Sequence, residues 1–153
     1  IAAGSLSKRL GIAEGTRLPR PTVEFYYKDD SLNDPLVTES QITTFEWASE
    51  AELGEIFEIA LRTNDFLSGL LLAVDLTLVD FKIEIGRSLK SEEEKLIIAD
   101  EISPDTCRLW DSKTKMRLDK DVFRLNKGSI AVAYTEVANR FDLLPKNVKS
   151  AVK

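Results

Sequence analysis

The stretch LVDFKIEIG, residues 78–86, constrains the fold most strongly, because its side chains alternate in character at the period of a β-strand. The apolar positions are Val79, Phe81, Ile83 and Ile85. The charged positions are Asp80, Lys82 and Glu84. On one strand face these three charges would span about 13 Å. Such a face is either a solvated outer surface, which is common in antiparallel sheets, or a site built on a rigid strand, and the pattern alone favours the solvated surface.

A long helix is expected directly before this strand. Ser49 and Glu52 have the spacing of a capping box, which marks a helix start. Apolar residues then recur at helical spacing as far as Leu71, so the helix should extend to about Val74. We interpret this apolar stripe as core packing.

The remaining elements predict an α+β fold. Further strands are expected at Val23–Lys28 and Leu96–Ile102, with a turn in DDSLNDP and a hairpin loop in GRSLKSEEEK. Residues 103–121 read as irregular, and residues 128–145 read as an amphipathic helix that ends at Pro145. This order indicates one domain over residues 1–153, with an antiparallel-rich sheet flanked by helices.

The composition excludes several classes of site. The chain has no histidine and one cysteine, so a histidine general base, a Ser-His-Asp triad and a thiolate zinc site are all excluded. A metal would have to be a hard cation held by carboxylates, which means magnesium, calcium or manganese. The net charge of −5 argues against nucleic acid as a partner. No apolar run approaches the roughly 18 residues of a membrane span, and we expect a cytoplasmic protein without a membrane partner.

The charged strand face becomes a candidate site if the next strand folds back onto it. A register that pairs Glu84 with Asp100 would also place Lys82 opposite Ile102. Two opposed carboxylates are tolerable beside a cation, and Mg²⁺ needs only one or two protein carboxylates. Lys82 would then direct its charge at a phosphate or a carboxylate.

Two further groups of residues suit anion binding. Arg108 follows a turn at residues 103–106, so a loop could present its guanidinium to the same opening. Gly4 and Ser5, followed by Lys8 and Arg9, could hold a phosphate through backbone N–H groups and a hydroxyl. Each signal is weak alone, since an ion-paired surface arginine and an ordinary Gly-Ser turn look the same.

Four segments in this order resemble the SAICAR synthetase family (phosphoribosylaminoimidazole-succinocarboxamide synthase). They are AAGSLSKRLGI, YYKDDSLNDP, LVDFKIEIG and DEISPDTCRLWD. The resemblance implies the larger lobe of an ATP-grasp-like fold. It also implies a ligase that joins L-aspartate to the carboxylate of carboxyaminoimidazole ribonucleotide (CAIR), using ATP and Mg²⁺, through an acyl phosphate.

The resemblance also implies roles for individual residues. Glu84 and Asp100 would handle magnesium and the ATP phosphates. Lys82 would contact a phosphate or the reacting carboxylate, and Asp80 and Asp34 would lie at the metal and substrate end of the cleft. Ser5 and Arg108 would grip the 5′-phosphate of CAIR, with Lys8 and Arg9 as electrostatic support. The resemblance gives no residue for the aspartate pocket.

The chain departs from the family pattern because the small N-terminal lobe that covers ATP is missing from it. We therefore expect residues 1–153 alone to bind ATP poorly and to be inactive. Because members of the family commonly associate, we also expect a homo-oligomer such as a dimer. The missing lobe also leaves open a non-catalytic nucleotide-binding or interaction module derived from this fold. A different acyl-phosphate ligase is the third alternative, and it would ignore CAIR.

Overall fold

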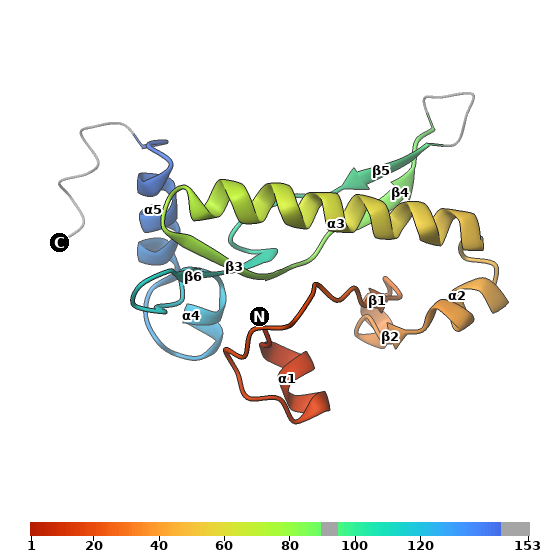
Figure 1. Ribbon diagram of the computed structural model, residues 1–153, viewed down its shortest axis with the longest axis horizontal. Helices are drawn as coiled ribbons and strands as arrows, with labels where there is room; N and C mark the ends of the chain where they lie inside the picture. Colours follow the sequence, from red (N-terminus) through yellow and green to blue (C-terminus); the bar gives the residue numbers. More distant parts are fainter. Residues whose placement is uncertain (90–94, 145–153) are drawn as a thin grey trace. The chain divides into compact units, whose positions relative to one another are not determined.

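The computed structural model describes residues 1–89 and 95–144, which form two compact units. The first unit contains residues 1–18, 66–83 and 100–144, and the second contains residues 19–65, 84–89 and 95–99. Helix α3 (Glu50–Leu72) is continuous and contributes to both units (Figure 1). Helices are combined with antiparallel strand pairs in both units, which confirms the predicted α+β class.

The elements of the first unit, besides the end of α3, are α1 (Gly4–Leu10), β3 (Leu76–Phe81), β6 (Cys107–Asp111), α4 (Asp121–Arg124) and α5 (Ile130–Arg140). Those of the second unit, besides the start of α3, are β1 (Phe25–Tyr26), the 3₁₀ helix η1 (Asp30–Leu32), β2 (Leu36–Val37), α2 (Glu39–Thr44), β4 (Glu84–Arg87) and β5 (Leu96–Ala99). The described strands form three two-stranded antiparallel ladders rather than one sheet.

The capping box at the start of α3 is present as predicted. The Ser49 N–H donates to Oε2 of Glu52 at 2.8 Å, and the Glu52 N–H donates to Oγ of Ser49 at 3.2 Å. These bonds satisfy backbone groups that a helix start would otherwise leave unpaired. Leu67 and Leu71 of the last turns are buried in the core, whereas Leu61 is 40% exposed, so core packing is confirmed for the last turns and not for the whole stripe.

The alternating stretch LVDFKIEIG, which the sequence predicts to be one strand, belongs to two strands. β3 pairs with β6 and β4 pairs with β5, and in the sequence Lys82 and Ile83 connect β3 to β4. The Lys82 N–H donates to the Thr106 carbonyl at 2.8 Å, instead of lying opposite Ile102. The predicted single line of three charges is therefore wrong, because the strand changes partner in its middle.

A register shift between Leu78 and Asp80 also breaks the apolar alternation in β3. Leu76, Leu78 and Phe81 all contact the main core, whereas Val79 packs in a second cluster with Ala3 and Trp110. An extra residue in one strand turns the following side chains to the opposite faces. Val79 and Phe81 thus belong to different clusters, and β3 is covered on both faces.

The segment over residues 103–121, which the sequence predicts to be irregular, contains β6. β6 pairs with β3, and Trp110 of β6 also forms an isolated antiparallel bridge with Arg117. The main core of the first unit forms around this strand and receives side chains from α3, α4 and α5. The buried members of this core are Leu67, Leu71, Leu76, Cys107, Leu109, Leu118, Val122, Ala133 and Val137.

Helix α5 confirms most of the prediction for the C-terminal segment. Ala133 and Val137 are buried, and Tyr134 and Phe141 pack against the same core. The helix ends at Arg140, and the predicted end at Pro145 lies outside the described residues.

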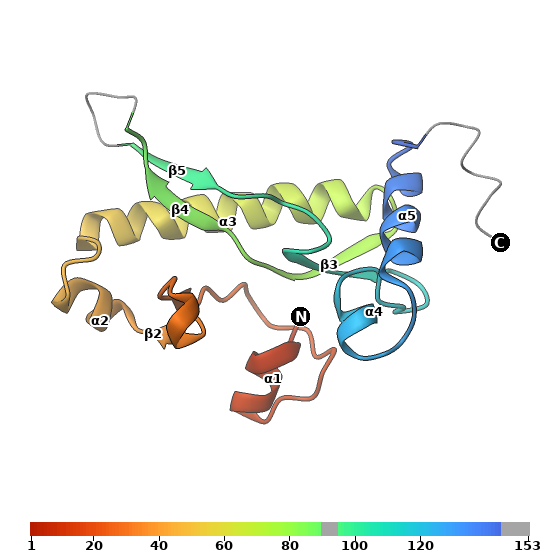
Figure 2. The ribbon, with the colours of Figure 1, turned by 180° about the vertical axis from the view of Figure 1, so that it is seen from behind.

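In the second unit β4 and β5 form the predicted hairpin, although most of its loop lies outside the described residues (Figure 2). The predicted strand at Val23–Lys28 is only Phe25–Tyr26. The predicted turn after it is confirmed, because the Asp29 carboxylate accepts from the backbone N–H groups of Ser31 and Leu32 and so begins η1. None of the helices in the described ranges is both long and apolar enough to span a membrane.

Candidate functional site

Arg108 is the centre of the candidate site in the first unit. It lies on strand β6, and not on a loop as predicted, and its register partner on β3 is Asp80. Nη1 of Arg108 donates to Oδ2 of Asp80 at 2.6 Å. The bulge before Asp80 creates this pairing, because it turns the carboxylate to the face from which Arg108 projects.

Asp121, the first residue of α4, binds the same guanidinium from another side. Nε of Arg108 donates to Oδ2 of Asp121 at 2.7 Å. Burial lowers the pKa of Arg108, but the Asp80 and Asp121 carboxylates outweigh burial and raise it above its ordinary value. The guanidinium is therefore charged at any physiological pH.

Asp119 supports this arrangement from inside the fold. Its side chain is fully buried, and its two carboxylate oxygens accept from the N–H groups of Asp121 at 2.7 Å and Leu109 at 2.8 Å. Burial raises the pKa of Asp119, although both backbone bonds oppose this shift. The carboxylate thus joins the backbone of α4 to that of β6.

Gly4, at the start of α1, completes the surroundings of Arg108. A Cβ atom placed on Gly4 would lie 2.8 Å from Nη2 of Arg108, closer than real Cβ atoms approach. The backbone at Gly4 also has a positive φ of 57°, which disfavours other residues. The structure thus brings the predicted Gly4-Ser5 segment and Arg108 together.

The other predicted residues of the first unit lie on its surface. Ser5, Lys8 and Arg9 are exposed on α1. Lys82 is exposed directly after β3, and Asp100 is exposed with a positive φ of 69° directly after β5.

In the second unit Glu84 begins β4, and its Oε1 accepts from Nζ of Lys28 at 2.6 Å. The predicted register of Glu84 with Asp100 is wrong by one residue, since Glu84 pairs with Ala99. Asp100 cannot extend the ladder because its left-handed backbone ends the strand. Asp34 lies in the turn after η1, where its carboxylate accepts from the Asp29 N–H at 2.9 Å.

The acidic side chains do not form a complete metal site by themselves. Within residues 1–89 and 95–144, no three Asp, Glu or Cys side chains gather closely enough to hold an ion. Oxygen donors such as Glu84, Asp100 and Asp80 nevertheless suit Mg²⁺, which takes most of its ligands from water and phosphates. Cys107 is buried, and burial raises the pKa of its thiol, so it is not a metal ligand in this state.

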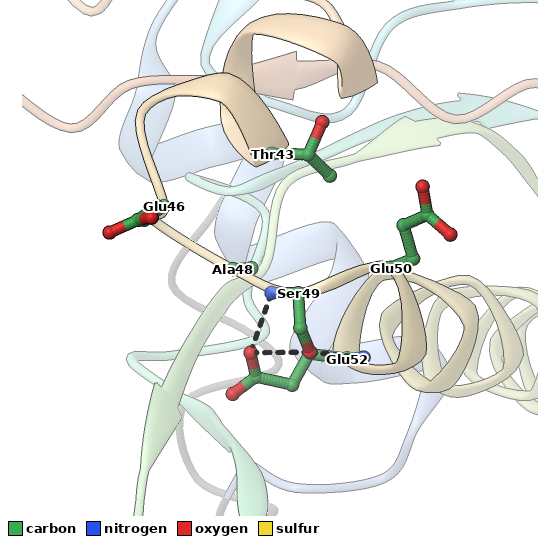
Figure 3. A pocket seen from close by; sticks show the side chains of 6 residues that line it. All are labelled: Thr43, Glu46, Ala48, Ser49, Glu50 and Glu52. Atoms are coloured by element: carbon green, nitrogen blue, oxygen red, sulfur yellow. Dashed lines mark hydrogen bonds between the residues drawn. The ribbon is translucent and has the colours of Figure 1, made fainter.

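A pocket at the start of α3 is lined by none of these predicted residues (Figure 3). Its lining includes Glu46, Glu50 and Glu52. The Glu52 carboxylate is bound to Ser49, as the dashed lines in Figure 3 show, and to Nε of Arg87 at 2.7 Å. This pocket is therefore part of the helix cap, and we assign it no ligand.

Sequence reasoning missed Asp119 and Asp121. The only local signal is LDKD, two acidic residues beside an apolar one, in a segment without a clear period. Their contacts are with Arg108 and Leu109 of β6, and the sequence of this segment does not predict that strand.

Comparison with known proteins matches residues 1–141 to the family described as SAICAR synthetase. The chain is 60% identical over 152 residues to a phosphoribosylaminoimidazole-succinocarboxamide synthase of Dinoroseobacter shibae, covering 99% of this chain and 60% of that protein. The chain thus spans about three fifths of the length of the curated relatives it matches.

Solved structures agree with the sequence comparison. A crystal structure of the synthase from Ehrlichia chaffeensis is 49% identical, with a TM-score of 0.90 over 95% of this chain and 61% of that one. A SAICAR synthetase in complex with ADP is 47% identical, with a TM-score of 0.86 over 92% of this chain and 58% of that one. The sequence and the fold both match, and Arg108 of the candidate site lies in one of the four characteristic segments. This chain therefore belongs to the SAICAR synthetase family.

Proposed function

We propose that the protein to which this chain belongs is an ATP-dependent ligase of purine biosynthesis. It joins the amine of L-aspartate to the carboxylate of CAIR and releases ADP and phosphate. The family match over residues 1–141 carries this proposal. The ADP complex of a related synthetase supports adenine nucleotide as the second substrate.

Arg108 is the proposed handle for the 5′-phosphate of CAIR, together with Ser5. Arginine presents a planar fork of N–H donors that suits a phosphate. The proximity of Arg108 to Gly4, the residue before Ser5, supports this pairing. Lys8 and Arg9 follow on the same short helix and would add attraction for the anion.

A phosphate that binds Arg108 must compete with the carboxylate of Asp80. This carboxylate is 42% exposed, so it can exchange Arg108 for water or for a cation at little cost. We propose that Asp80 and Asp34 act at the metal and substrate end of the site.

Glu84 and Asp100 are proposed to bind Mg²⁺ and to orient the ATP phosphates. When bound, the ion supplies positive charge to the transferring phosphoryl group. Lys82 adds a second positive charge, which would favour phosphorylation of the CAIR carboxylate to an acyl phosphate. Charge neutralisation and positioning supply most of the catalysis in such transfers.

The test measures CAIR- and aspartate-dependent ADP formation by the full-length protein. We expect Glu84→Ala and Lys82→Ala to lower kcat strongly, and Arg108→Ala to raise mainly the KM for CAIR. Asp75→Asn is the matched control, because within residues 1–89 and 95–144 the Asp75 carboxylate bonds only to the exposed Lys113.

Absence of CAIR-dependent turnover in the wild-type protein would overturn the proposed reaction. Turnover with another carboxylate in place of CAIR would instead indicate a different acyl-phosphate ligase. A cytoplasmic location and association into dimers remain predictions, which cell fractionation and light scattering would check.

A further inference from the structure

The anion-binding arginine is held by acidic residues for which the family resemblance gave no role. We propose that Asp121 is a positioning residue, which fixes the guanidinium of Arg108 for the phosphate of the substrate, and that Asp119 holds Asp121 in place. This inference rests on the proposed function, because it assumes that Arg108 binds the phosphate of CAIR.

The two carboxylates around Arg108 differ in their accessibility. The Asp121 side chain is 12% exposed and binds Nε, whereas the Asp80 side chain is 42% exposed and binds Nη1. An arriving anion can therefore displace Asp80 while Asp121 keeps its bond. A carboxylate fixed at Nε sets the plane of the guanidinium and leaves the Nη nitrogens to the ligand.

Nη2 faces the start of α1. Among the described residues none accepts a hydrogen bond from it, and the missing side chain of Gly4 leaves it room. With Nε bound by Asp121, this nitrogen is held next to the Gly4-Ser5 segment. Nη2, a donor that is proposed to bind the phosphate, thus lies beside the residue that precedes Ser5.

Asp119 holds the backbone of Asp121 in place, whatever the side chain of Asp121 binds. Its buried carboxylate binds the N–H of Asp121 and the N–H of Leu109, which directly follows Arg108 on β6. The backbones that carry the donor and its holder are therefore tied to one rigid group. Hydrogen bonds of this charge-assisted kind are stronger than those between neutral groups.

The charges argue for orientation rather than for simple attraction. Two carboxylates contact the guanidinium of Arg108, and Nη1 of Arg124 lies 3.8 Å from Oδ1 of Asp121, so these four side chains carry no net charge. This neutralisation weakens the attraction of Arg108 for an anion. A site selected only for positive potential would not place both there. Their benefit to phosphate binding must come from a fixed direction of the donors.

The test uses the full-length enzyme with Asp121→Asn, Arg108→Ala and the double variant, and with Asp75→Asn as the control. We expect Asp121→Asn to raise the KM for CAIR by about tenfold, because a charged acceptor at Nε is lost. The kcat and the KM values for ATP and aspartate should change little. The double variant should be no worse than Arg108→Ala, since Asp121 acts through Arg108.

A spectroscopic readout separates positioning from stability. In ¹⁵N-labelled protein the Nε–H of Arg108 should give a resolved, slowly exchanging signal that Asp121→Asn shifts and that exchanges faster in the variant. A purely structural ion pair would lower the unfolding midpoint without a selective change in the KM for CAIR.

Each outcome has a separate meaning. An unchanged KM for CAIR in Arg108→Ala contradicts the proposed role of Arg108. A raised KM in Arg108→Ala but not in Asp121→Asn, or effects of the two that simply add, overturns the positioning role alone. If Asp121→Asn does not fold, Asp119→Asn retains the Asp121 carboxylate and must raise the KM for CAIR in the same direction, and an unchanged KM there overturns the proposal.

Discussion

Nη2 of Arg140 lies 2.6 Å from Oδ2 of Asp111, and this pair joins the last turn of α5 to the end of β6. The same guanidinium donates through Nη1 to the Asp75 carbonyl at 2.8 Å, just beyond the end of α3. One side chain therefore joins three segments of the first unit. The bond from the Thr114 N–H, followed by the bond from Arg140, holds the pKa of Asp111 well below its usual range.

Arg140→Met should consequently lower the thermal unfolding midpoint of the protein by several degrees. The substitution keeps the aliphatic stem but leaves Asp111 and the Asp75 carbonyl without this donor. Glu136→Gln is the control, because it weakens only a half-exposed pair within α5 and should have little effect. Equal midpoints for Arg140→Met and the wild type would contradict the joining role.

Gly4→Ala should reduce CAIR affinity more than it reduces stability. The new Cβ would meet Nη2 of Arg108 at 2.8 Å and push the guanidinium from its place. Gly11→Ala is a matched control, since Gly11 has a similar φ of 64° and no atom within 4 Å of its Cβ position. Both variants should lose about 1 kcal/mol to backbone strain, but only Gly4→Ala should raise the KM for CAIR. Titration calorimetry with CAIR and denaturant unfolding would separate the two effects.

Because of Glu52 in the capping box of α3, the free energy of unfolding should depend on pH in the acidic range. The side-chain bond from Arg87, followed by the bond from the Ser49 N–H, lowers the pKa of Glu52 from 4.5 to about 2. A depressed carboxyl pKa adds stability that is complete above pH 4.5 and is lost as the pH falls toward 2.

Unfolding midpoints across this pH range should therefore converge for the wild type and Glu52→Gln. Glu50→Gln serves as the comparison, because the described residues offer its side chain no hydrogen bond. A constant difference between wild type and Glu52→Gln down to pH 2 would refute the effect.

Trp47 should contribute to stability through its two stacked neighbours in the second unit. Its ring centroid lies 4.4 Å from that of Tyr27 and 5.2 Å from that of Phe45. Aromatic pairs contribute about 0.5–1.5 kcal/mol each beyond burial, so Trp47→Leu should cost about 2 kcal/mol in urea unfolding. Phe45→Leu breaks only one pair and should cost less, and the reverse order would contradict the central place of Trp47.

The parts of the fold that depend on nearby residues were predictable from the sequence. Helix α3 combines a capping box with apolar residues at helical spacing, and both signals lie within the helix. The turn at η1 is equally local, because Asp29 binds N–H groups two and three residues ahead. Such short-range patterns constrain the backbone whatever the rest of the chain does.

The strand partners were not predictable in the same way. The sequence of residues 78–86 reads as one alternating run, yet its halves pair with β6 and β5. The sequence did not predict β6, because buried Asp111 and half-buried Arg108 interrupt its apolar pattern. The bulge that places Asp80 opposite Arg108 depends on these distant strands and leaves no local signal.

For the candidate site, the resemblance directed attention to Arg108, Ser5 and Asp80, but it gave no role to Asp119 and Asp121. Asp121 and Asp119 act on Arg108 through folded geometry. Their part could be inferred only after β6 and α4 were placed.

The first unit is assembled from three separate stretches of chain, and this has a consequence for biosynthesis. On the ribosome, Gly4 and Asp80 emerge before Arg108, and Asp121 emerges last. The arginine site therefore cannot form while the chain is still short. Val79 and Ala3, which pack against Trp110, stay without this partner until β6 has emerged. A nascent chain stalled before residue 107 should thus be a better substrate for chaperones than one released after residue 121.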